Sequence, residues 1–112
     1  MYISFYLRSN RIHIFVDALR AIGSPERICF LMNESGDKLI LAPYGKRDLL
    51  SHKVSQEIYD GRDGLDISSF KLCTIISRMY NWDCSKSYRV IGKLINAHNV
   101  IMYDLNKATV IF

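Results

Sequence analysis

The chain has 112 residues, of which 49% are apolar and 23% are charged. This length fits one domain, or two small units that share a core. The composition is that of a folded globular protein and argues against a disordered chain. No apolar run approaches the ~20 residues of a membrane-spanning helix, and the N-terminus lacks the basic leader of a signal peptide. We therefore expect no membrane association and a cytoplasmic location.

The formal net charge is +4, which is a mild basic bias. Residues 1–53 contain eight Lys/Arg against five Asp/Glu, whereas residues 54–112 contain seven against six. Most of the excess positive charge therefore belongs to the first half of the chain. Such a balance permits nucleic-acid binding without requiring it.

The first half reads as two strands, a short helix and a hairpin. Residues 2–7 and the segment from Arg11 alternate at the period of a strand, with a turn at 8–10 between them. From Val16 the apolar spacing becomes helical and ends at Gly23. Residues 28–32 and 38–43 then predict a hairpin around a turn that contains Gly36.

The second half predicts the same order of elements. Residues 55–60 and 65–68 are expected to be strands. A helix follows, with Ser68 or Ser69 as its N-cap. Its expected apolar face is formed by Phe70, Cys73, Ile76 and Met79 or Tyr80. Residues 87–94 and 100–105 are predicted to form the second hairpin.

A shift of about 60 residues superimposes the two patterns. Ile28 and Phe30 then align with Tyr88 and Val90, and Leu39 and Leu41 with Val100 and Met102. We predict an α+β, mostly β fold in which two β-β-α-β-β units form a small pseudo-twofold barrel. Residues 1–112 would be one domain made of two repeats (1–43 and 54–112) and a linker (44–53), because neither unit can bury its apolar face alone.

Part of the first unit resembles a known family. "RIHIF" at 11–15 lies where its second strand would be, and "LRAIG" at 19–23 where its short helix and helix break would be. With the hairpin that follows, residues 8–44 resemble the AbrB/MazE/SpoVT swapped-hairpin DNA-binding domains. Asn10 stands where the family has a glycine, and Phe15 where it has a proline. The resemblance implies double-stranded DNA as the partner and a role as a bacterial transcriptional regulator or antitoxin-like protein.

Basic side chains are the candidate nucleic-acid ligands, because phosphate contacts need Lys/Arg spread over one exposed face. Two of them flank the first turn, one lies on the first helix, three lie in or next to the linker, and one lies at the matching turn of the second unit. These residues are Arg8, Arg11, Arg20, Lys46, Arg47, Lys53 and Arg62. At this density they could equally form an ordinary solvated surface. The alternative function is therefore a protein-interaction or assembly module, a homodimer included, with no nucleic-acid role.

No pattern in the sequence predicts catalysis. There is no phosphate-binding loop, nucleophile elbow or paired-metal spacing, and His13 has no local catalytic partner. Because His13 lies across its strand from Ile12 and Ile14, we expect its side chain to be exposed. The acidic segment 57–66 lacks the ligand spacing of a calcium loop and is expected to be a turn. We therefore predict a protein that is not an enzyme and has no cofactor or metal.

The cysteines and aromatic residues are expected to be structural. Cys29 and Cys73 lie in apolar runs typical of buried thiols, and a zinc site at the cysteines would need His13, His52 or His98 to be brought in by folding. A base-stacking role for the aromatic side chains is the alternative to a core role. Packing in the core is favoured for Phe5, Phe30, Trp82 and Tyr88.

Overall fold

A computed structural model describes residues 1–46 and 51–111 of the chain. The strands are β1 (Tyr2–Tyr6), β2 (Arg11–Phe15), β3 (Arg27–Met32), β4 (Lys38–Pro43), β5 (His52–Lys53), β6 (Gly64–Ser68), β7 (Ser87–Ile95), β8 (Val100–Asp104) and β9 (Thr109–Val110). The helices are α1 (Val16–Ala21), α2 (Gln56–Tyr59), α3 (Phe70–Met79) and the 3-10 helix η1 (Leu105–Lys107). Most predicted strands and both predicted helices are confirmed.

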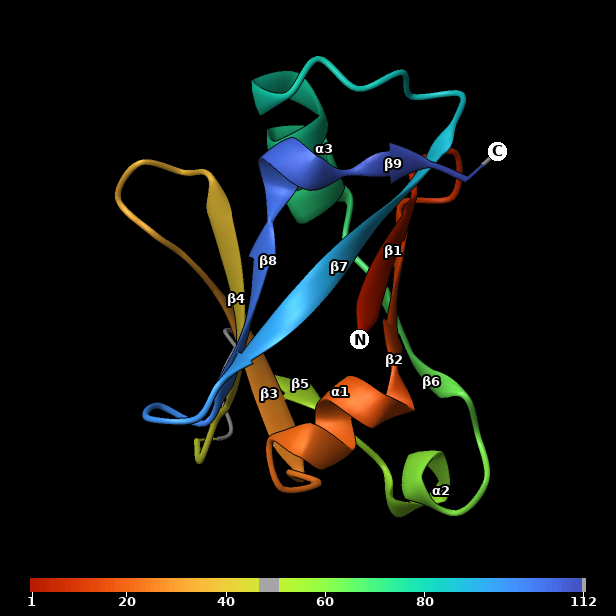
Figure 1. Cartoon of the computed structure of the whole chain (residues 1–112). Coiled ribbons are helices and arrows are strands. Elements are labelled where there is room, and N and C mark those ends of the chain that lie inside the picture. The colour runs from red at the N-terminus through yellow and green to blue at the C-terminus, as the bar shows by residue number, and fades with distance from the viewer. Residues whose placement is uncertain (47–50, 112) are drawn as a thin grey trace.

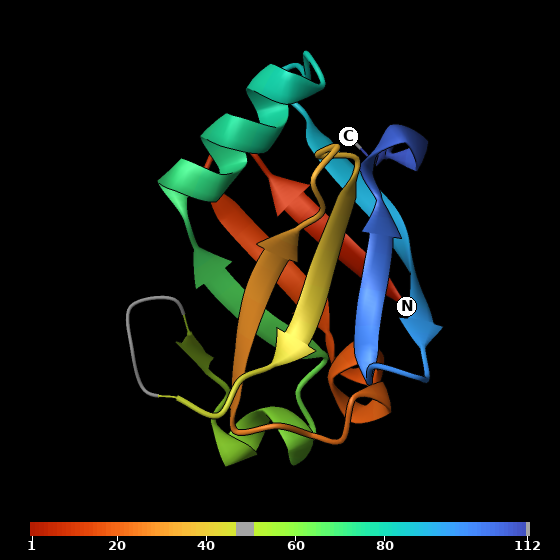
Figure 2. The ribbon, with the colours of Figure 1, turned by 90° about the vertical axis from the view of Figure 1, so that its left-hand side faces the viewer.

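The strands form a small, nearly closed antiparallel barrel (Figure 1). The order around it is β5-β3-β4-β8-β7-β1-β2-β6, with β9 paired to β7. In the views of Figures 1 and 2, α3 lies at one end of the barrel and α1 and α2 lie at the other. The predicted mostly β barrel is therefore confirmed at this level. Among the residues that the structure describes, no helix is both long and apolar enough to cross a membrane.

The predicted strand at 55–60 is wrong, because this segment contains the helix α2. Val54 and Ile58 are both buried; Val54 precedes the N-cap Ser55, and Ile58 lies within the helical turn. The Tyr59 hydroxyl fixes the helix by donating a 2.7 Å hydrogen bond to the Pro25 carbonyl. Gly61, with φ of 125°, then turns the chain toward β6. Burial of Ile58 decides the conformation here.

One apolar core receives side chains from both halves of the chain. Leu19, Leu41, Cys73, Ile76 and Val90 all belong to it and are almost fully buried. In β8, however, the buried residues are Ile101 and Tyr103. The alignment of Leu39 and Leu41 with Val100 and Met102 is therefore wrong by one residue. In a strand, a one-residue change moves every side chain to the opposite face.

The helix α3 begins as predicted, with the Ser69 hydroxyl accepting a hydrogen bond from the Leu72 amide. Cys73 and Ile76 face the core, as expected. The assignment of Phe70 to the buried face is wrong, because its side chain is 70% exposed; of the two alternatives for the last position, Tyr80 packs against the core and Met79 is 49% exposed. The helix crosses an end of the barrel, so only a narrow stripe of its surface reaches the core.

The aromatic residues expected in the core are found there or at its edge. Phe5 and Tyr88 are buried. Trp82 stacks on Tyr88 with ring centroids 4.4 Å apart and meets Phe5 edge-on at 5.5 Å. These rings close the α3 end of the barrel, and Phe30 is partly buried against the same core. Their packing confirms the core role.

Candidate nucleic-acid interface

The predicted basic residues lie at both ends of the barrel. Arg8 lies in the β1–β2 turn and Arg11 begins β2, at the α3 end (Figure 1). Arg20 lies on α1 at the other end and donates a 3.0 Å hydrogen bond to the Tyr59 carbonyl. Arg62 follows α2 there and forms a 3.7 Å ion pair with Glu57. The structure thus keeps Arg8 and Arg11 together and separates them from Arg20 and Arg62.

The linker lysines also lie away from Arg8 and Arg11. Lys53 pairs in β5 with Arg27, at the start of β3. Tyr44 donates its amide to the Arg27 carbonyl, which places the segment leading to Lys46 close by. Arg47 lies outside the described residues.

Four further basic residues that sequence reasoning did not select belong with Arg8 and Arg11: Lys71, Arg78 and Lys86 lie in the segments of the α3 end, and Arg89 lies beside Arg11 along the barrel wall. We call the six residues the basic end: Arg8, Arg11, Lys71, Arg78, Lys86 and Arg89. The segments that carry them, 7–11 and 69–89, contain one acidic residue, Asp83. The Ser69 amide donates a 2.9 Å hydrogen bond to the Asn10 carbonyl, which joins the β1–β2 turn to the start of α3. Contacts between residues far apart in sequence therefore bring these two basic segments together.

Asp83 also links these segments. Its pKa is held below the usual range, chiefly because the Ser85 side chain and amide donate to it, and to a smaller extent because Lys86 and Arg8 are positively charged. The Asp83 amide in turn donates a 2.8 Å hydrogen bond to the Tyr88 hydroxyl. Arg8 and Lys86 thus act on the same carboxylate, while both side chains are solvent-exposed.

Two arginines of the basic end are held by aromatic rings. The guanidinium carbon of Arg11 lies 4.6 Å from the centre of the Tyr6 ring. That of Arg89 lies 5.4 Å from the Tyr2 ring and 5.3 Å from the Phe15 ring. These contacts restrain each guanidinium while leaving N–H groups for further hydrogen bonds. They also occupy ring surface that base stacking would require.

Ser4 contributes a further restraint on Arg89. Its buried hydroxyl accepts a 3.2 Å hydrogen bond from the Arg89 Nε. Because Ser4 and Arg89 are register partners in β1 and β7, the strand pairing sets this contact. Arg89 is therefore oriented from two sides, by strands that the sequence alone did not show to be neighbours.

His13 lies beside these arginines and not, as expected, in solvent. A hollow of about 380 Å³ is lined by Tyr6, Arg11, His13, Phe15, Asp63, Asp66 and Arg89. The His13 side chain is only 10% exposed. The Phe15 ring covers it edge-on at 4.6 Å, and Gly64 leaves room for it by lacking a side chain. The prediction of an exposed side chain is therefore wrong.

Two carboxylates face the His13 ring. Its Nδ1 lies 2.8 Å from the Asp66 Oδ1 and its Nε2 lies 3.8 Å from the Asp63 Oδ1. Asp66 is the register partner of His13 across β2 and β6, and it also lies 3.7 Å from the Arg11 Nε. This β2–β6 pairing has no local signal in the sequence, which explains why the cluster was missed.

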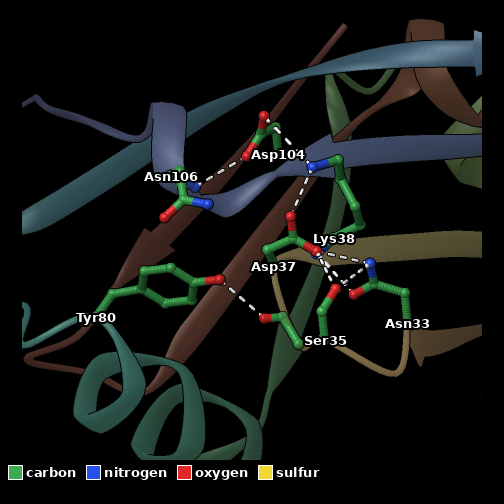
Figure 3. Close-up of polar contacts among 8 residues, drawn as sticks. Asn33, Ser35, Asp37, Lys38, Tyr80, Asp104 and Asn106 are labelled. Carbon is green, nitrogen blue, oxygen red and sulfur yellow. Dashed lines mark hydrogen bonds and ion pairs between the residues drawn. The ribbon is translucent and has the colours of Figure 1, made fainter.

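A second polar cluster braces the β3–β4 turn (Figure 3). Asp37 accepts hydrogen bonds from Asn33 at 2.6 Å and Ser35 at 2.8 Å, and pairs with Lys38 at 2.9 Å. Lys38 also reaches Asp104 at 3.5 Å. The Tyr80 hydroxyl donates to the Gly36 carbonyl at 2.8 Å, tying the turn to the end of α3. These contacts give the polar groups of the turn hydrogen-bond or ion-pair partners, and they connect the turn to β8 and to the end of α3.

The thiols do not gather into a site. Cys29 and Cys73 are buried, as expected, and Cys84 is exposed. Burial raises the pKa of the Cys73 thiol to about 11, so it stays protonated near neutral pH. Within residues 1–46 and 51–111, no three His, Cys, Asp or Glu side chains are placed to hold a metal ion.

Comparisons with known proteins give no relative for this chain. No family model matches it, and neither the curated proteins nor the solved structures contain a match.

Proposed function

We propose that this chain is a nucleic-acid-binding module that contacts double-stranded DNA through the basic end. The observation that carries the proposal is that segments 7–11 and 69–89 contribute six Lys/Arg and one acidic residue, while Asp63 and Asp66 offset the charge of Arg11 and Arg89 alone. Phosphate contacts supply most of the affinity of such modules, and they require this kind of one-sided charge. The resemblance of residues 8–44 to swapped-hairpin DNA-binding domains supports the same partner and a regulatory role.

The residues of the basic end are suited to different contacts. Arg8, Lys71 and Lys86 are exposed, so they can follow the phosphate backbone. Arg11 and Arg89 are restrained by aromatic rings, and a fixed guanidinium is the better donor for a base edge or for two phosphate oxygens. The opposite end is less suited to DNA, because Glu57 lies 3.7 Å from Arg62 and Asp60 lies close to it in sequence.

We also infer that the barrel is an internal duplication, and the strand registers support this. Tyr6 and Phe5 of β1 pair with Ser87 and Tyr88. In the same way, Lys53 and His52 of β5 pair with Arg27 and Ile28, which precede Ser87 and Tyr88 by 60 residues. Each of β2 and β6 leads into a helix and a hairpin, and these two strands pair with each other. The strands β4 and β8 likewise pair with each other.

A salt titration of DNA binding tests the proposed function. We expect a fluorescein-labelled duplex to bind at ~50 mM salt, with an affinity that falls as salt rises. Each of Arg8→Ala, Lys71→Ala and Lys86→Ala should weaken binding and reduce the slope of log K against log salt by about one. Arg62→Ala is the matched control, because it removes an equally exposed arginine at the opposite end. No binding at ~50 mM salt, or an equal loss with Arg62→Ala, would exclude the basic end.

A protein-interaction module is the second candidate, and the exposed apolar residues of α3 favour it. Phe70, Ile75 and Met79 are 70%, 43% and 49% exposed. Aromatic residues and methionine are enriched at protein interfaces. Under this hypothesis Phe70→Ser should abolish binding to a purified protein partner, or self-association measured by sedimentation, while DNA binding is absent. If the chain binds no protein partner, does not self-associate, and binds DNA equally well with and without Phe70→Ser, the first function is favoured.

A further inference from the structure

The His13 ring has one nitrogen with a partner and one without. Nδ1 lies 2.8 Å from the Asp66 carboxylate, so this nitrogen carries the proton that the carboxylate accepts. In the neutral ring, Nε2 is then an acceptor, and it is buried without a hydrogen-bond donor. The atom that it faces, at 3.8 Å, is an oxygen of the Asp63 carboxylate. Two acceptors therefore oppose each other in a partly enclosed hollow.

A proton on Nε2 removes this conflict. The ring then donates from both nitrogens and lies as a cation between Asp63 and Asp66. The charged groups that line the hollow with it are Arg11 of β2, Arg89 of β7 and the two aspartates, with the Tyr6 hydroxyl of β1 also present. Two arginines and two aspartates balance, so the proton changes the local charge from zero to one positive.

The proton also changes the partner of Arg11. Asp66 Oδ1 is shared between His13 Nδ1 at 2.8 Å and Arg11 Nε at 3.7 Å. A cationic His13 neutralises this carboxylate and weakens its hold on Arg11. The Arg11 side chain, which is 47% exposed, is then free to donate to a phosphate.

We propose that His13 is a proton switch for the basic end, and that proton uptake at its Nε2 tightens binding of a nucleic-acid phosphate by releasing Arg11. This inference rests on the proposed DNA-binding function. Proton uptake by the ring increases as pH falls, so binding should strengthen as pH is lowered. The same sign follows from the added positive charge.

Duplex affinity against pH tests the switch. At constant salt, the chain should bind the labelled duplex about three- to tenfold more tightly at about pH 5.5 than at about pH 8. His13→Gln should lose most of this dependence. His98→Gln is the control, because His98 is exposed in the β7–β8 turn. An equal pH dependence in His13→Gln and in the unaltered chain would overturn the switch, and no binding at any pH would overturn the proposed function.

A second measurement needs no DNA and covers a failure of His13→Gln to fold. Proton NMR follows the ring signals of the three histidines as pH is lowered. In Asp63→Asn the carboxylate that favours a proton on Nε2 is gone, so the His13 signal should change at a lower pH than in the unaltered chain. The pH at which the His98 signal changes should be the same in the two proteins. Asp63 is 84% exposed, so its substitution should not disturb the fold. An unchanged His13 titration in Asp63→Asn would contradict the geometry on which the switch depends.

Discussion

At the scale of single residues, polar side chains fix the turns and helix ends from which the basic end is built. Asp37 shows how strongly a turn can hold a carboxylate. Its pKa lies well below the usual range, first because Asn33 donates to it and then because Lys38 and Ser35 do. A carboxyl with a lowered pKa in the folded state adds stability above its unfolded pKa of about 3.8, and this stability is lost as pH falls below that value.

Asp37→Asn should therefore be destabilising near neutral pH and less so in acid. We expect the difference in Tm between the unaltered chain and Asp37→Asn to shrink as pH is lowered from about 6 to about 2, mostly below 3.8, because the unfolded chain then takes up a proton that the folded Asp37 still resists. Thermal unfolding followed by circular dichroism measures it. A difference that stays constant over this range would mean that the charge of Asp37 does not stabilise the turn.

The N-cap of α3, Ser69, can be tested by substitution. Its hydroxyl accepts a hydrogen bond from the Leu72 amide at 3.2 Å. Ser69→Ala should lower the free energy of unfolding by about 1 kcal/mol, as measured by urea titration. Ser68→Ala is a matched control, because the Ser68 side chain is exposed. Equal effects of the two substitutions would argue against the cap.

At the scale of elements, β7 connects the two faces of the barrel. Residues 87–91 of this strand pair with β1, whereas residues 92–95 pair with β8. Gly92 lies where the pairing changes, and a side chain there would collide with the Tyr103 ring and with Ile101. The missing side chain leaves room for Tyr103 and Ile101 where β7 changes its partner from β1 to β8.

Gly92→Val should therefore destabilise the barrel, by on the order of 1–3 kcal/mol for an overpacked site. Lys93→Val introduces the same side chain at an exposed neighbour and should change stability by less than about 0.5 kcal/mol. Urea unfolding of the two variants compares them directly. A Gly92→Val protein as stable as Lys93→Val would show that β7 can bend without a glycine.

At the scale of the whole molecule, the halves depend on each other. The strands β1, β2 and β4 of the first half pair with β7, β6 and β8 of the second. A fragment of residues 1–53 would lose all three pairings and expose the core residues Leu19 and Leu41. We expect it to be unfolded by circular dichroism, or to fold only as a dimer by sedimentation. A folded monomer would show that the first half has a core of its own.

The candidate site could be predicted only in part. Arg8 and Arg11 are close in sequence, so they could be found as neighbours. Lys71, Lys86 and Arg89 could not be grouped with them, because their proximity depends on α3 and β7 crossing the same end of the barrel. Arg20 and Arg62 show the converse, because they were grouped with Arg8 by charge but lie on α1 and after α2, at the other end of the barrel.

Most of the local elements of this protein follow from patterns among neighbouring residues. Alternating apolar residues define β1 and β2, short apolar runs around a turn define β3 and β4, and helical spacing with a serine cap defines α3, because these signals arise from neighbouring residues. The tertiary structure decided what no local pattern contains. It replaced a predicted strand by α2 because Ile58 could reach the core, and it shifted the buried residues of β8 to Ile101 and Tyr103. It also enclosed His13 between Asp63 and Asp66, because the pairing of β2 with β6 joins residues more than 50 positions apart. Such contacts follow from the closure of the barrel, which depends on the fit of the whole core.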